Sequence, residues 1–296
     1  MAVVEEGYVR ILGHRTWYRS VGGNRDPSRL PLLAIHGGPG ATHVTLRPLE
    51  ALAEGGRQVV FYDQLGCGRS DRPGETVDWS IALFLHELAA VRRALRLTRV
   101  HVLGHSWGGM LALEHVLAGA EGVRSLVLAS TPVNMRQWVH EARHLRSLLP
   151  DDVRRTLERH EAEGTTDDGE YVGAMLEYYR RHVCRLEPWP PSVVETMLEL
   201  FENPVVYRAM NGPSEFHVTG SLRDWGVVRR LEEVRVPVLI TSGRHDEATP
   251  AIARIAYRGI PGARWTIFDQ SAHMPHLEEP EAYRACLEHF LNEVES

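Results

Sequence analysis

The stretch VHVLGHSWGGMLAL, residues 100–113, decides how the rest of the chain is interpreted. Residues 100–103 are predicted to form a short buried strand and residues 107–117 a helix. The turn between them is G-x-S-x-G, with small residues on either side of Ser106. Such a turn leaves the serine hydroxyl exposed at the helix N-terminus, where the helix dipole favours developing negative charge. Because glycine-rich strand–helix turns also occur without a nucleophile, Ser106 takes that role only together with partners elsewhere in the chain.

Asp246 and His273 are the partners that the chain order supplies. A serine hydroxyl is a weak nucleophile and needs a base that an acid orients. Asp246 follows the predicted strand 236–241, and His273 follows the predicted strand 265–268. The order serine, acid, histidine is that of the α/β-hydrolase fold. We therefore predict a catalytic triad of Ser106, Asp246 and His273.

Two other histidines compete for the role of base. His276 lies three residues beyond His273, and His245 is next to the predicted acid. His273 is preferred because it opens the pattern H-x-x-x-x-E-x-P, whereas His245 is interpreted as structural. The alternative interpretations are a loop-capping carboxylate for Asp246 and a surface position for His273.

The sequence HGGPG, residues 36–40, supplies the expected oxyanion hole. It follows the predicted strand 32–35, and its glycines let the backbone approach the substrate oxygen. We expect the backbone N–H groups of Gly38 and of Trp107, the residue after the nucleophile, to stabilise the oxyanion. Without Ser106 nearby, an ordinary Gly-Pro turn would explain the same residues.

The order of elements predicts an α/β fold. The predicted strands are 8–12, 15–21, 32–35, 58–62, 100–103, 125–129, 236–241 and 265–268. The predicted helices are 81–95, 107–117, 139–149, 152–163, 171–182, 192–201 and 280–294. We expect the α/β-hydrolase fold, in which a mostly parallel central sheet carries helices on both faces. Residues 1–130 and 226–296 would form this core, and residues 131–225 an inserted helical cap over the carboxyl edge of the sheet.

Composition excludes several classes of function. The 33 basic and 39 acidic residues give a net charge of −6, which offers no basic face for nucleic acid or acidic lipid. Neither a signal peptide nor a membrane-spanning stretch is predicted. Three cysteines without CxxC spacing favour reduced thiols, a cytoplasmic location and no structural zinc. All basic residues are arginine, so a lysine Schiff base and a Ser–Lys dyad are excluded. Separately, we expect no metal or organic cofactor.

Six motifs together resemble the proline iminopeptidase (prolyl aminopeptidase) family of α/β-hydrolases. They are HGGPG (36–40), DQLGCGRSD (63–71), GHSWGGMLAL (104–113), GPSEF (212–216), GRHDEATP (243–250) and SAHMPHLEEP (271–280). The motifs cover most of the chain, and HGGPG with GHSWGG is specific to this branch of the fold. The resemblance implies Ser106, Asp246 and His273 as the triad and a helical cap near residues 131–225.

The resemblance also implies a binding site for a free ammonium group. Glu215 in GPSEF and Glu247 beside the predicted acid match the family's ammonium-binding acids. A desolvated ammonium needs an opposite charge, so carboxylates suit the task. Each glutamate could instead be a solvated surface charge.

The expected activity is that of a serine aminopeptidase or amidase. It would hydrolyse the amide bond after a free N-terminal amino acid, proline or another small residue, through an acyl-enzyme. The substrate would be a small molecule or short peptide with a free amino terminus. The arginine-rich composition and the resemblance together suggest, as one possibility, removal of a terminal aminoacyl group from a macrolactam in antibiotic biosynthesis.

Three alternatives stay open. An esterase, thioesterase or lipase of the same fold would not need Glu215 and Glu247. Dehalogenase or epoxide hydrolase chemistry usually needs an aspartate nucleophile, which Ser106 disfavours. A non-catalytic ligand-binding receptor on the same scaffold would not need an intact triad. No oligomeric state is predicted.

Overall fold

An eight-stranded sheet forms the centre of the protein in the computed structural model, which describes residues 3–23, 26, 28–74 and 77–296. The strands are β1 (Val4–Ile11), β2 (His14–Val21), β3 (Leu32–Ile35), β4 (Val59–Tyr62), β5 (Val100–His105), β6 (Val123–Ala129), β7 (Val238–Gly243) and β8 (Arg264–Phe268). Their order is β1-β2-β4-β3-β5-β6-β7-β8. β1, β2 and β4 pair antiparallel, and every pair from β4 to β8 is parallel. The expected mostly parallel sheet is confirmed.

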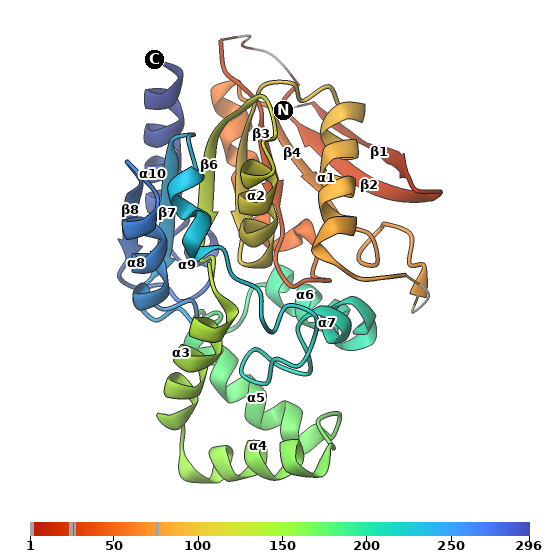
Figure 1. The fold of residues 1–296 in the computed structure, drawn as a ribbon, viewed down its shortest axis with the longest axis vertical. Helices are drawn as coiled ribbons and strands as arrows, with labels where there is room; N and C mark the ends of the chain where they lie inside the picture. The colour runs from red at the N-terminus through yellow and green to blue at the C-terminus, as the bar shows by residue number, and fades with distance from the viewer. Residues whose placement is uncertain (1–2, 24–25, 27, 75–76) are drawn as a thin grey trace.

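Helices cover both faces of this sheet (Figure 1). They are α1 (Ile81–Ala94), α2 (Trp107–Leu117), α8 (Pro250–Gly259), α9 (Pro275–Glu278) and α10 (Pro280–Glu295), with 3₁₀ helices η1 (His43–Gly55) and η3 (Val228–Glu233). Side chains of a strand point alternately to opposite faces. In β3, Leu33 and Ile35 accordingly pack with α1, α2 and α8, whereas Leu32 and Ala34 pack with η1 and α10. The strand is wholly buried, which explains why its sequence is continuously apolar.

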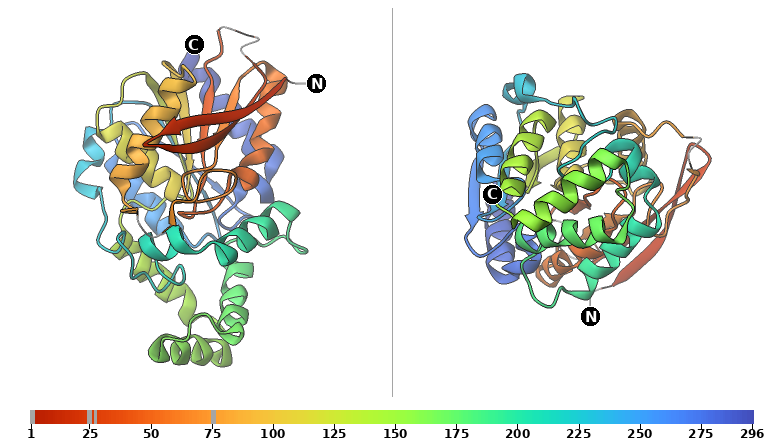
Figure 2. Two further views of the ribbon diagram at one scale, coloured as in Figure 1. Left: turned by 90° about the vertical axis from the view of Figure 1, so that its right-hand side faces the viewer. Right: turned by 90° about the horizontal axis from the view of Figure 1, so that it is seen from below.

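Five further helices follow β6 and precede β7. They are α3 (Met135–Ser147), α4 (Asp151–Glu163), α5 (Gly169–His182), α6 (Pro191–Glu202) and α7 (Val205–Met210). We call them the inserted helices. They project from one end of the sheet, opposite the C-terminal end of α10, as Figure 1 and the left-hand view of Figure 2 show. A separate apolar cluster joins α3, α4, α5 and α6, and Met274 from the loop before α9 belongs to it, whereas Val206 and Met210 of α7 pack in the main core.

Several boundaries differ from the sequence-based prediction. The helix expected at 139–149 begins at Met135, because the side chain of Asn134 accepts a hydrogen bond from the Gln137 N–H and caps it. The strand expected from 236 begins at Val238, directly after Pro237, which has no N–H to donate. The helices η1, α7, η3, α8 and α9 were not predicted. η1 contains Pro48, which obscures its pattern.

Within the described part of the chain, none of the helices combines the length and the apolar character needed to cross a bilayer.

Candidate active site

Ser106 lies at the turn between β5 and α2 in a strained conformation. Its φ of 54° and ψ of −122° are unfavourable for a residue with a side chain. The glycines on either side are required by space. A Cβ at Gly104 would lie 2.2 Å from the Gly108 carbonyl oxygen, and one at Gly108 would lie 2.3 Å from the oxygen of Ile35. The G-x-S-x-G turn therefore presents its serine as the motif predicts.

His273 and Asp246 meet although they come from separate loops. The His273 Nδ1 lies 2.7 Å from Asp246 Oδ1, and both side chains are almost wholly buried. The same carboxylate oxygen accepts the Ala248 N–H at 2.7 Å, which fixes its position. The competing His276 is instead packed against His105, with ring centroids 5.0 Å apart, and burial lowers the pKa of His276 to about 3.

One small cavity collects the predicted site residues. It has a volume of about 50 Å³ and is lined by Ser106, His273, Gly38, Glu215 and Glu247, among others. Trp107 follows Ser106 directly and begins α2, so its backbone N–H is one of those a helix leaves without an internal partner. Five of the seven predicted residues thus line one cavity, although Gly38 and His273 are 235 positions apart in the sequence.

Gly37 and Gly38 bring backbone close to the serine. A Cβ at Gly37 would lie 3.1 Å from that of Ser106. Gly38 has φ +106°, a conformation that side chains rarely adopt. This stretch of HGGPG can therefore face Ser106 only without side chains.

Two acids share the cavity with the serine and histidine. Glu247 is buried, and its Oε1 lies 3.8 Å from His273 Nε2. Its Oε2 has no hydrogen-bond partner among the described residues. Burial raises the pKa of Glu247 well above its ordinary value, and the nearby Glu215 and Asp246 raise it further. A buried carboxylate with one unpartnered oxygen can be stabilised by a cation that binds beside it.

A tyrosine of the inserted helices holds Glu215 in place. The Tyr207 hydroxyl, from α7, donates a hydrogen bond of 2.6 Å to Glu215 Oε1. Burial raises the pKa of Glu215, although the bond from Tyr207 opposes this shift by favouring the charged form. From the sequence, Tyr207 is only one of several aromatic residues that could line an apolar pocket, and nothing indicates it as a partner of Glu215.

The inserted helices are fastened to both loops that carry the acid and the histidine. The Glu247 N–H donates to the His182 carbonyl, and the His273 N–H donates to the Val183 carbonyl, each at 3.1 Å. Glu278 accepts the N–H groups of Ala272 and Met274, on either side of His273, and its other oxygen accepts the Arg185 N–H. The pattern H-x-x-x-x-E was thus a signal for Glu278, whereas nothing indicated the segment at 182–185.

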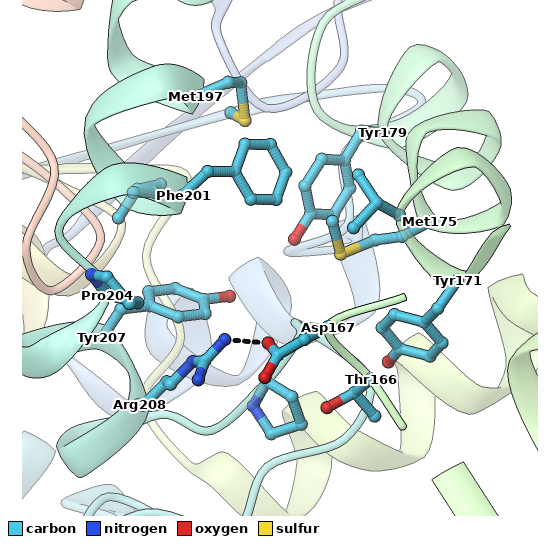
Figure 3. Close-up of a pocket in the computed structure, with 13 residues that line it drawn as sticks. Thr166, Asp167, Tyr171, Met175, Tyr179, Met197, Phe201, Pro204, Tyr207 and Arg208 are labelled. Carbon is cyan, nitrogen blue, oxygen red and sulfur yellow. Dashed lines mark hydrogen bonds and ion pairs between the residues drawn. The ribbon is translucent and has the colours of Figure 1, made fainter. Parts of the chain in front are cut away.

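Figure 3 shows a second, larger cavity. Its volume is about 400 Å³, and its walls come from α5, α6, α7 and the loop before α5. Tyr179, Met197 and Leu200 line both cavities. An ion pair between Arg208 and Asp167 lies beside it, as the dashed line in Figure 3 shows. The remaining lining is mainly apolar, which suits an uncharged part of a substrate.

His160, Asp168 and Glu170 form a grouping with suitable spacing for a metal within the described ranges. Asp168 caps α5, His160 bonds Thr165, and Glu170 pairs with Arg159. These contacts account for the three side chains without a metal.

Comparison with known proteins places the chain in a family. Residues 31–280 match the family model described as alpha/beta hydrolase fold. The chain is 39% identical to the proline iminopeptidase of Heyndrickxia coagulans over 98% of this chain and 99% of the relative. It is 38% identical to that of Saccharolobus solfataricus, over 99% and 94%.

Solved structures agree with this placement. The crystal structure of VinJ matches with a TM-score of 0.95 at 42% identity, covering 98% of this chain and 99% of VinJ. The proline iminopeptidase of Mycobacterium smegmatis matches with a TM-score of 0.91, also at 42% identity and over the same shares. The chain belongs to the proline iminopeptidase family of α/β-hydrolases.

Proposed function

We propose that this protein is a serine aminopeptidase that removes an N-terminal amino acid carrying a free ammonium group. One observation carries the proposal. Glu247, whose Oε2 lacks a hydrogen-bond partner within the described part of the chain, lines the same cavity as Glu215, Ser106 and His273. A substrate whose ammonium lies between the two acids would have its first carbonyl next to the serine. The names of the relatives support the same activity.

The mechanism follows from the positions of these groups. Ser106 Oγ attacks the carbonyl carbon while His273 takes its proton, and the carbonyl oxygen becomes an oxyanion facing the N–H groups of Gly38 and Trp107. Asp246 orients His273 and stabilises the imidazolium. Collapse breaks the C–N bond, and His273 returns the proton to the leaving amine. Water then repeats the sequence on the acyl-enzyme and releases the amino acid.

The two cavities suggest how a substrate is divided. The small one suits the side chain of proline or another small residue, because about 50 Å³ leaves little more room. The leaving amine would extend into the adjoining cavity of about 400 Å³. Its apolar walls suit an uncharged amine, such as that of a macrolactam, as well as a short peptide.

The proposal includes the organisation of the chain. Residues 1–130 and 226–296 would act as the core and residues 131–225 as a cap that supplies Glu215 and Tyr207. A cytoplasmic location is consistent with three free cysteines.

A paired substrate assay tests ammonium recognition. Prolyl and alanyl amides should be hydrolysed, and their N-acetylated forms should not. Glu215→Gln and Glu247→Gln should raise KM for the free amides by about 10- to 100-fold, with a smaller change in kcat, since a buried charged hydrogen bond is worth about 1.5–3 kcal/mol. Glu163→Gln, an exposed acid of α4, is the matched control.

Equal turnover of acetylated and free substrates would reject the aminopeptidase in favour of an esterase-like amidase. The receptor alternative is tested separately by labelling with a fluorophosphonate. Loss of labelling in Ser106→Ala, with labelling of the parent protein, would exclude it.

A further inference from the structure

We propose that His36 and Gln64 are positioning residues that hold both oxyanion donors in place. This inference rests on the proposed function, because it takes the N–H groups of Gly38 and Trp107 as those donors. Gln64 follows β4 and His36 follows β3, and the two side chains are at most 1% exposed. Neither lines the cavity around Ser106, so they act through their neighbours.

The Gln64 amide connects the two sides of the oxyanion hole. The Trp107 Nε1–H donates to Gln64 Oε1 at 2.8 Å. Because an indole N–H can only donate, the amide oxygen must face Trp107. The amide nitrogen then faces the other way and donates to the His36 carbonyl at 3.0 Å. The Gln64 side chain thus connects Trp107, which carries one oxyanion donor, to His36 at the end of β3, two residues before the other donor, Gly38.

The His36 ring is held in one tautomer by backbone groups. The Gln64 backbone N–H lies 3.0 Å from His36 Nε2, and it can only donate, so Nε2 must be unprotonated. His36 Nδ1 therefore carries the proton and donates to the Gly37 carbonyl at 2.9 Å. Burial lowers the pKa of His36 to about 4, so the ring is neutral near pH 7, as this pair of bonds requires.

The bond to Gly37 determines where the Gly38 N–H points. The Gly37 carbonyl and the Gly38 N–H belong to one trans peptide, in which they point in opposite directions. Fixing the carbonyl on His36 therefore fixes the N–H away from His36. Two adjacent glycines would otherwise let this peptide plane rotate. Donors that need no reorientation during the reaction stabilise an oxyanion most strongly.

Substitutions separate this role from general folding. His36→Leu and Gln64→Met should lower kcat by about 10- to 100-fold while KM for the aminoacyl amide stays within about threefold. His36→Asn should keep more activity than His36→Leu, because its amide nitrogen can replace Nδ1. Tyr62→Phe is the matched control. It removes a buried hydroxyl, near His36, that has no hydrogen-bond partner among the described residues, and kcat should not change.

A transition-state analogue gives the decisive measurement. An aminoacyl boronate forms a tetrahedral adduct on a serine and places an oxygen where the oxyanion would lie. In His36→Leu and Gln64→Met, the affinity of the enzyme for the boronate should fall in proportion to kcat/KM. The affinity for the product amino acid should stay constant. Parent-like kcat in His36→Leu and Gln64→Met, or equal losses for boronate and product, would overturn the inference. If His36→Leu does not fold, Gln64→Met carries the same test.

The variant Ser106→Ala tests the proposed function separately from the positioning role of His36 and Gln64. Ser106→Ala should abolish turnover and boronate binding. Activity in Ser106→Ala would reject the proposed function itself. An inactive Ser106→Ala beside unimpaired His36→Leu and Gln64→Met would reject only the positioning role.

Discussion

Ser106 and Glu247 are each held in a state that is unfavourable on its own. A positive φ at a residue with a side chain costs about 1–3 kcal/mol, and Glu247 is a buried carboxylate near two others. The turn at Ser106 is formed by neighbouring residues, so the motif GHSWG was enough to predict it. The environment of Glu247 is formed by Asp246, Glu215 and His273, which come from three separate segments. No single sequence motif could therefore predict it.

The raised pKa values of Glu215 and Glu247 predict a proton release on substrate binding. Burial shifts both acids toward the protonated form by raising their pKa values, whereas a bound ammonium favours the ionised form. Binding should therefore expel a proton, and KM for a free aminoacyl amide should rise as pH falls through the raised pKa values. Calorimetry with an amino-acid product in two buffers of different ionisation enthalpy measures the release. Glu247→Gln should release fewer protons, and an equal release would contradict the pairing.

The helices and strands that the sequence predicted best are those with a clear pattern of buried apolar residues. β3 and β4 are buried on both faces and α1 has a clear apolar face, so their patterns identified them. The missed η1 contains a proline and is a 3₁₀ helix, so it lacks the period of an α-helix. Helix α8, which was not predicted, buries Ile252, Ala253 and Ala256. Two of these three residues are alanine, which contributes little to a recognisable apolar pattern.

The two ends of the inserted segment are bonded to each other. Asn134 and Gly226 form an isolated antiparallel bridge, with the Met135 N–H donating to the Trp225 carbonyl and the Val227 N–H to the Val133 carbonyl. Asn134 also caps α3. These contacts explain how a long insertion can leave and re-enter the core at one place.

This junction predicts a coupling between two substitutions. A Cβ at Gly226 would lie 2.8 Å from Asn134 Nδ2, so Gly226→Ala should displace the cap. Asn134→Ala and Gly226→Ala should each lower the free energy of unfolding by about 1 kcal/mol. The double variant should lose no more than either single one, because both remove the same cap. Urea denaturation measures all three, and additive losses would show that the cap and the clash are unrelated. Asp168→Ala, the N-cap of α5, is the control cap outside the junction.

At the scale of the whole molecule, Glu295 joins segments from three parts of the chain. Its carboxylate accepts hydrogen bonds from both terminal nitrogens of Arg57 and from the Leu30 N–H. His101 Nε2 in β5 lies 3.1 Å from it. Burial alone would raise the pKa of Glu295, but these partners outweigh burial and lower it to about 2. The end of α10 is thereby fastened to the amino ends of the central strands, opposite the active site.

Removing this carboxylate should destabilise the whole protein. Glu295→Gln leaves the Arg57 guanidinium, 2% exposed, buried without its counter-charge, which typically costs about 3–5 kcal/mol. Because the folded-state pKa lies below the ordinary value of 4.5, the contribution is complete above that pH and is lost as pH falls toward 2. The difference in unfolding free energy between parent and variant should therefore shrink with acidification. Glu293→Gln, two residues away in an exposed pair with Arg264, should leave the free energy of unfolding nearly unchanged. Equal losses of unfolding free energy in Glu295→Gln and Glu293→Gln at pH 7 would show that the contacts of Glu295 do not stabilise the protein.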